Sequence, residues 1–162
     1  MEENKIIYNI IGIVHSSHKS IEGIPIQPIG AKGIKAEIKL SEEFQEGLKD
    51  LEGFSHIIVI YDFHKSKDFK LKVKPFLDNE NRGVFATRAP KRPNSIGLSV
   101  LKLNKIVKNI LYVENVDILD GTPVLDIKPY ASRFDLVEKE RNGWLEKSID
   151  KSSVKKSDNR FR

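Results

Sequence analysis

Residues 83–99 place three cations on a loop that two prolines make stiff. Arg88, Lys91 and Arg92 stand beside Pro90 and Pro93. Because proline fixes its own backbone dihedral, cations next to it lose less conformational entropy when they meet an anion. A guanidinium in such a loop can hold a carboxylate or a phosphate through two parallel hydrogen bonds. The pattern predicts an anion-binding loop, with an ordinary rigid surface turn as the alternative.

Residues 117–130 (DILDGTPVLDIKPY) form a second dense segment, in which three carboxylates and a lysine interrupt apolar residues. Asp120 and Gly121 are typical of a turn between two strands. Asp126 and Lys128 are two residues apart, so they share one face of a strand. A polar pair is costly to bury without a partner, which favours a salt bridge over a polar pocket lining.

Several other chemistries have no support in the sequence. Neither a Gly-x-Gly-x-x-Gly run nor a phosphate-binding Gly-x-x-x-x-Gly-Lys-Ser/Thr run is present. The chain has no cysteine, which excludes disulfides, thiolate nucleophiles and sulfur-ligated zinc. His15 and His18 have no further ligand in register, so we expect them to be solvated and expect no metal site.

The positions of apolar residues predict many strands and little helix. Residues 34–40 alternate apolar and polar side chains, the period of two expected for a half-buried strand. Ser41 offers a helix N-cap, and residues 41–53 are expected to form a short helix. Further strands are expected at residues 6–15, 56–63, 84–87, 98–107, 110–118 and 123–128. Long strand-helix alternation is missing, which favours a mainly β fold, a small single-sheet β-barrel with one or two short helices.

The length of 162 residues suits one domain. We expect this domain at residues 1–146 and a basic, flexible C-terminal tail at residues 147–162. No apolar run is long enough to cross a bilayer and the acidic start lacks a signal peptide's basic region, so a cytoplasmic protein with no membrane contact is expected. Residues 64–108 hold 12 Lys or Arg against 3 Asp or Glu, a net charge of +9 that suits a phosphate backbone or a solvated lysine-rich face.

The cationic loop and residues 117–130 together resemble the hallmark stretches of the TsaA/TrmO-like family, also called YaeB-like. Three further pieces agree in order and approximate spacing: residues 11–16 (IGIVHS), residues 25–28 (PIQP), and residues 53–56 (GFSH) leading to residues 61–64 (YDFH). The resemblance covers roughly residues 6–130, and the run DGTPVxDIKPY is its most specific part.

This resemblance implies a homodimeric β-barrel enzyme that uses S-adenosylmethionine to methylate the exocyclic nitrogen of threonylcarbamoyladenosine, the purine 3′ of the anticodon in certain tRNAs. The cosubstrate would be held by Pro25, Ile26, Gln27, His64, Lys65, Arg88, Leu98, Leu119, Asp120, Gly121 and Thr122. RNA would contact Lys91, Arg92 and Asn94. The attacking nitrogen loses a proton, for which His64 or Asp126 is the candidate base.

Two hypotheses from other functional classes are alternatives to an enzyme. A non-catalytic S-adenosylmethionine sensor would not need the basic middle segment and basic tail. A plain RNA-binding barrel would need recurrent exposed aromatics for base stacking, and aromatics are only 8% of the chain.

Overall fold

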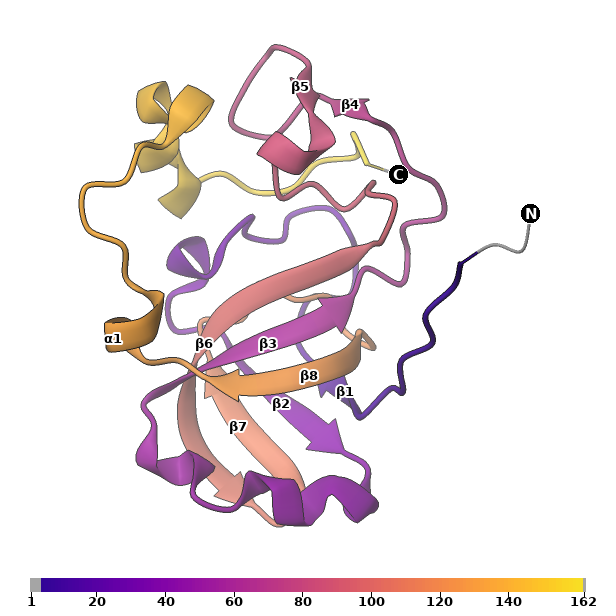
Figure 1. Ribbon diagram of the computed structural model, residues 1–162, viewed down its shortest axis with the longest axis vertical. Coiled ribbons are helices and arrows are strands. Elements are labelled where there is room, and N and C mark those ends of the chain that lie inside the picture. Colours follow the sequence, from indigo (N-terminus) through magenta and orange to yellow (C-terminus); the bar gives the residue numbers. More distant parts are fainter. Residues whose placement is uncertain (1–3, 162) are drawn as a thin grey trace.

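The computed structural model describes residues 4–161, and its centre is a closed antiparallel barrel of six strands (Figure 1). The strands follow one another around the barrel in the order β1-β2-β7-β6-β3-β8. Their bounds are β1 (Gly12–His15), β2 (Lys35–Leu40), β3 (His56–Asp62), β6 (Ile96–Val107), β7 (Ile110–Glu114) and β8 (Pro123–Pro129). The predicted mainly β fold, a small barrel of one sheet, is confirmed.

The remaining elements are short. A two-stranded hairpin pairs β4 (Lys72–Val73) with β5 (Arg82–Gly83), and the single α-helix of the described residues is α1 (Ser132–Asp135). Six 3₁₀ turns complete the fold: η1 (Pro28–Ala31), η2 (Glu42–Leu48), η3 (Leu51–Gly53), η4 (Val84–Ala86), η5 (Gly143–Lys147) and η6 (Ile149–Ser153).

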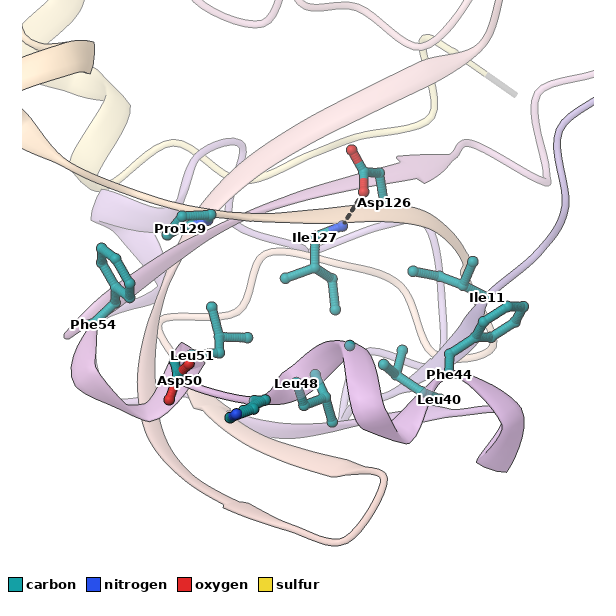
Figure 2. Close-up of a pocket in the computed structure, with 12 residues that line it drawn as sticks. Ile11, Leu40, Phe44, Leu48, Asp50, Leu51, Phe54, Asp126, Ile127 and Pro129 are labelled. Carbon is teal, nitrogen blue, oxygen red and sulfur yellow. Dashed lines mark hydrogen bonds between the residues drawn. The ribbon is translucent and has the colours of Figure 1, made fainter.

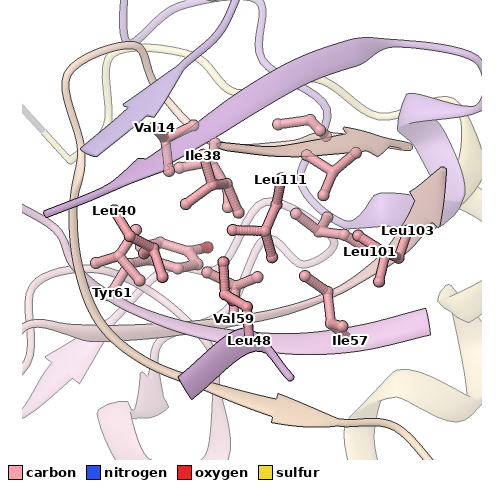
Figure 3. Packing of buried hydrophobic residues seen from close by; sticks show 14 residues of the cluster. Val14, Ile38, Leu40, Leu48, Ile57, Val59, Tyr61, Leu101, Leu103 and Leu111 are labelled. Atoms are coloured by element: carbon pink, nitrogen blue, oxygen red, sulfur yellow. The ribbon is translucent and has the colours of Figure 1, made fainter. Parts of the chain in front are cut away.

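Alternating side chains of the strands fill the barrel. Ile57, Val59 and Tyr61 of β3 are buried, and Figure 3 shows them in one cluster with Leu101 and Leu111. The same period of two leaves the intervening residues of each strand on the outer face. The barrel interior is therefore a packed apolar core.

Four predicted elements differ from the structure. Residues 84–87 form the 3₁₀ turn η4 rather than a strand, because the Thr87 hydroxyl donates to the Val84 carbonyl at 2.8 Å. Residues 41–53 form η2 and η3 rather than one helix, because Asp50 adopts a left-handed φ of 67° between them. The strand predicted at residues 6–15 begins only at Gly12, and the one predicted at residues 110–118 ends at Glu114.

Residues 147–161, predicted to be a flexible tail, contact two other parts of the chain. Pro25 and Lys156 form an isolated antiparallel bridge. Phe161 is 7% exposed and joins Val73, Val84 and Ala89 in a second small core. The C-terminal segment thus lies beside both the long loop after β1 and the β4-β5 hairpin, in the upper half of Figure 1.

Candidate functional site

The cationic loop and the long loop after β1 meet through one side-chain contact. The Nη1 group of Arg88 donates a hydrogen bond to Oε1 of Gln27 at 3.0 Å, across 61 positions of sequence. The acceptor is a neutral amide, and the other N–H groups of Arg88 have no acceptor among residues 4–161. An exposed guanidinium with unused donors can take a carboxylate, so the structure retains the anion-binding capacity that the sequence predicts.

The other two cations of this loop are engaged within the fold. Arg92 donates from Nη1 to the carbonyls of Val84, Thr87 and Ala89, at 3.1, 2.7 and 3.3 Å. The side chain of Lys91 is 8% exposed and lies 2.9 Å from a carboxylate oxygen of Asp68. These two predicted RNA contacts therefore shape the loop, while Asn94 is exposed.

The turn at Leu119–Thr122 uses most of its amides internally. Asp120 N–H donates to His18, Gly121 N–H to Val14, and Thr122 N–H to Leu119. The Thr122 hydroxyl also donates to the Leu119 carbonyl, at 2.6 Å. Within residues 4–161 the Leu119 N–H has no acceptor, so it is the amide of this turn that is available to a ligand.

The carboxylate of Asp120 ties this turn to the start of the long loop. It lies 2.7 Å from Lys19 Nζ and accepts from the Ser16 N–H at 2.9 Å. The hydrogen bond from Lys19, followed by that from the Ser16 amide, lowers the pKa of Asp120. Asp120 is thus a charged anchor of the turn, in addition to its predicted place in the cosubstrate site.

A polar network that the sequence analysis did not predict as a site joins the buried Tyr61 and Ser99 to the half-buried Asp117. The Ser99 hydroxyl donates to Asp117 Oδ1 at 2.7 Å, so the Tyr61 hydroxyl, 3.0 Å away, donates to Ser99. Burial raises the pKa of Asp117 to about 6, and the Ser99 hydrogen bond and the Arg88 charge oppose this shift. Burial also raises the pKa of Tyr61 above its ordinary range.

The sequence did hold a signal for this network. Ser99 lies in the inward-facing row of β6 with Leu101 and Leu103. A hydroxyl in an otherwise apolar row needs a buried partner. Asp117 is the acidic residue that the 115–122 connection brings to it.

His64 follows β3 and is half-buried. Burial lowers its pKa, the neighbouring Lys65 lowers it further, and the Asp62 charge works in the opposite direction. The imidazole is therefore neutral at neutral pH and can accept a proton. Lys65 beside it is exposed, and Leu98 on the outer face of β6 is 45% exposed.

Asp126 lies on the outer face of β8, paired in register with Ile60 of β3. Its carboxylate is 2.6 Å from Lys128 Nζ, which confirms the predicted salt bridge. Figure 2 shows Asp126 directed away from an apolar groove into which Ile127 of the same strand points. This groove, of about 360 Å³ between β8 and residues 44–54, is lined by Leu48, Leu51 and Phe54 among others and contains none of the other predicted site residues.

No group of three or more His, Asp or Glu within residues 4–161 has the arrangement of a metal site. His18, predicted to be solvated, is half-buried with Nε2 2.8 Å from the Val116 carbonyl. In the same range no helix has the length and apolar character needed to span a bilayer.

Comparison with known proteins places these features in a family. The family model of the tRNA-methyltransferase O N-terminal domain matches residues 13–136. The chain is 53% identical to a "Probable S-adenosyl-L-methionine-binding protein" of Pyrococcus abyssi, over 96% of this chain and 85% of that protein. It is 37% identical to the mouse "tRNA (adenine(37)-N6)-methyltransferase", over 83% of this chain and 33% of that protein. A crystal structure of TrmO from Pseudomonas aeruginosa superposes with a TM-score of 0.75 and 38% identity, over 88% of this chain and 63% of that chain.

The chain belongs to the TrmO family. It spans one third of the mouse relative and 63% of the crystallised TrmO chain, but 85% of the Pyrococcus protein.

Within this TrmO-family barrel, one hydrogen bond joins two of the predicted site segments, from Arg88 to Gln27. The charge of Arg88 also acts on Asp117, which lies in the same connection as the turn at Leu119–Thr122. Asp126 takes part in none of these contacts.

Proposed function

We propose that this chain is an S-adenosylmethionine-dependent methyltransferase of tRNA whose target is the exocyclic nitrogen of threonylcarbamoyladenosine beside the anticodon. The observation that carries the proposal is the Arg88–Gln27 contact, at 3.0 Å, between two loops expected to hold the cosubstrate. Membership of the TrmO family and the names of its relatives support the reaction class.

The residues at this junction fit a sulfonium nucleoside. Arg88 has unused donors for the methionine carboxylate, and the Leu119 N–H is available to the adenine edge. The exposed side chain of Leu98 and the half-buried Ile26 offer apolar contacts. Pro25, Gln27, Lys65 and the turn residues Asp120, Gly121 and Thr122 complete the proposed set, with the last three shaping the turn.

The sulfonium supplies an activated methyl group, which passes in line to the attacking nitrogen. A nitrogen–carbon bond forms, the carbon–sulfur bond breaks with its electron pair left on sulfur, and the nitrogen loses a proton. The protein's share is alignment and exclusion of water. His64 is the proposed proton acceptor, because its lowered pKa keeps the imidazole neutral.

The finer substrate is tested by incubating the protein with labelled S-adenosylmethionine and tRNA that carries or lacks the threonylcarbamoyl group, followed by nucleoside analysis. We expect label only on the modified adenosine. Label on unmodified adenosine would overturn the substrate, and binding without transfer to either tRNA would favour a sensor. The sensor remains the second candidate because the Pyrococcus relative is named for binding alone.

We also propose a homodimer. Two segments expose apolar side chains of the kind that subunit interfaces bury: Ile6, Ile7 and Tyr8 before β1, and Phe134, Leu136 and Val137 at and after α1. Sedimentation equilibrium is expected to give twice the chain mass, and a monomer at all concentrations would contradict the proposal.

A further inference from the structure

We propose that residues 65–74, here called the lysine segment, form a contact surface for single-stranded RNA, with Phe69 as a stacking platform between lysines. This inference rests on the proposed tRNA substrate. It assigns RNA contact to residues other than Lys91, Arg92 and Asn94.

Charge is the first observation. The lysine segment carries Lys65, Lys67, Lys70, Lys72 and Lys74, and all five are exposed. Its one acid, Asp68, is 2.9 Å from Lys91 Nζ. No carboxylate of residues 4–161 forms a salt bridge with any of the five lysines. Five exposed cations outside any of these salt bridges suit a phosphate backbone, whose condensed counterions they can displace.

The backbone of the lysine segment is fixed to the cationic loop. The Ser66 hydroxyl donates to the Pro90 carbonyl at 3.1 Å, and the Lys70 N–H donates to the Lys91 carbonyl at 3.3 Å. Leu71 accepts from the Val84 N–H at 2.9 Å. These contacts hold the lysines beside the loop that carries Arg88, so they differ from a solvated charge run without tertiary anchors.

The hairpin end of the lysine segment packs on the small core that contains Phe161. Val73 of β4 is 4% exposed and packs with Phe161 of the C-terminal segment. Because side chains alternate along a strand, the burial of Val73 directs Lys72 and Lys74 to the outer face. The surface is therefore presented by a packed scaffold.

Exposed aromatic rings are the second observation. Phe69 is 55% exposed among the lysines, and Phe85 of the adjoining η4 is 76% exposed. The guanidinium carbon of Arg92 lies 5.9 Å from the centre of the Phe85 ring. Exposed cations with an exposed ring among them and a second ring nearby suit a strand of phosphates and unstacked bases, and stacking tolerates any base sequence. An acidic protein surface would complement only the charge, which is why RNA is the partner argued.

The test compares three variants for binding to an anticodon stem-loop RNA over a range of salt concentrations. K67Q/K72Q/K74Q is expected to weaken binding at least tenfold and to reduce the slope of log K against log salt by about 2. Phe69→Ala is expected to weaken binding roughly fivefold to a hundredfold with an unchanged slope, because it removes stacking and no charge. The control K35Q/K39Q/K49Q removes three exposed lysines elsewhere and should leave affinity within about twofold.

Each outcome decides something. Equal losses in the control and the test triple would overturn the proposal, as would unchanged RNA binding by Phe69→Ala and the test triple. If the test triple lost binding to phosphatidylserine vesicles but kept its RNA binding, the surface would be assigned to lipid. That result would also overturn the proposal. Titration of all variants with S-adenosylmethionine separates the two hypotheses: wild-type protein that binds RNA but no S-adenosylmethionine would defeat the proposed function and leave the RNA surface standing.

Discussion

The guanidinium of Arg88 and the side-chain amide of Gln27 lie 3.0 Å apart and join the cationic loop to the long loop that follows β1. Arg88 also acts on a carboxyl group: burial raises the pKa of Asp117 to about 6, and the charge of Arg88 is one of the effects that oppose this rise. The Arg88 guanidinium therefore interacts with the long loop through a hydrogen bond and with Asp117 through its charge.

Arg88→Ala is expected to weaken S-adenosylmethionine binding on the order of ten- to a hundredfold, the size of a lost charge-assisted contact. Titration calorimetry measures it. Gln27→Ala is the comparison: Gln27 is also in the proposed cosubstrate set, but the substitution leaves the cation in place and removes a neutral amide, so a smaller loss is expected. Equal losses in the two variants would contradict a charge-assisted contact between Arg88 and the ligand.

His64→Asn is expected to lower kcat for methyl transfer by about a hundredfold or more if the imidazole accepts the proton. Burial and the Lys65 charge lower the pKa of His64, so the acid limb of the wild-type kcat profile should lie below 6.5. Asp126→Asn is the control, since its carboxylate lies in the outer-face salt bridge with Lys128, and kcat should stay within about threefold. A loss confined to Asp126→Asn would move the base to β8.

Gly97→Ala is expected to destabilise the fold by roughly 1–3 kcal/mol through overpacking. A Cβ on Gly97 would overlap a ring carbon of Tyr61 and stand 2.9 Å from the ring of Phe63. Urea unfolding measures the change. Gly47→Ala, where nothing lies within 4 Å, should be neutral or slightly stabilising, and equal effects at both positions would refute the close approach.

The barrel could be predicted because its signal is local. The alternation at residues 34–40 and the β-branched run at 56–63 specify β2 and β3 without knowledge of their partners. Residues 84–87 show the limit, since a short apolar run with Val84 and Thr87 suits a strand equally well. The hydrogen bond from Thr87 to Val84 that makes it a 3₁₀ turn is a property of the folded loop.

The candidate site was predictable only in part, for a related reason. Motif resemblance singles out Gln27 and Arg88, and the structure brings them into contact. Asp117 was counted only as one of three carboxylates, because its hydrogen-bond partner Ser99 is 18 positions away on another element. The contacts of the C-terminal segment were not predicted for the same reason: its lysines and serines suit solvent, whereas Ser157 is hydrogen-bonded to a loop more than 130 positions away.

Asp117→Asn is expected to flatten the dependence of stability on acidic pH. Burial raises the pKa of Asp117 to about 6 from 3.8, so the folded protein keeps a proton that the unfolded chain has lost. The free energy of unfolding of the wild type therefore falls as the pH rises from about 4 to about 6, by roughly 3 kcal/mol at most. Asparagine keeps an acceptor for Ser99 and does not titrate, so the stability of the variant relative to wild type should grow through this window. Urea unfolding at several pH values measures this difference. If the difference in free energy of unfolding between the two proteins stayed constant from pH 4 to pH 6, Asp117 would have an ordinary pKa.

Ser157 of the C-terminal segment is hydrogen-bonded to the long loop that follows β1. Its hydroxyl accepts from the Ile24 N–H at 2.9 Å and donates to the Ile21 carbonyl, and its backbone pairs with Gly23 and Ile24. Ser157→Ala leaves the backbone pairs and removes both side-chain bonds. We expect about a fivefold weaker affinity for S-adenosylmethionine, equivalent to roughly 1 kcal/mol.

Ser153→Ala is the matched control for this prediction. That hydroxyl donates only to the Asp150 carbonyl within its own turn, so S-adenosylmethionine affinity should not change. The salt dependence of RNA binding adds a second readout: Ser157→Ala changes no charge and should leave the slope unaltered. An intact affinity for S-adenosylmethionine in Ser157→Ala would mean that the backbone pairs to Gly23 and Ile24 are enough to hold the long loop, and that the Ser157 hydroxyl does not contribute to the proposed site.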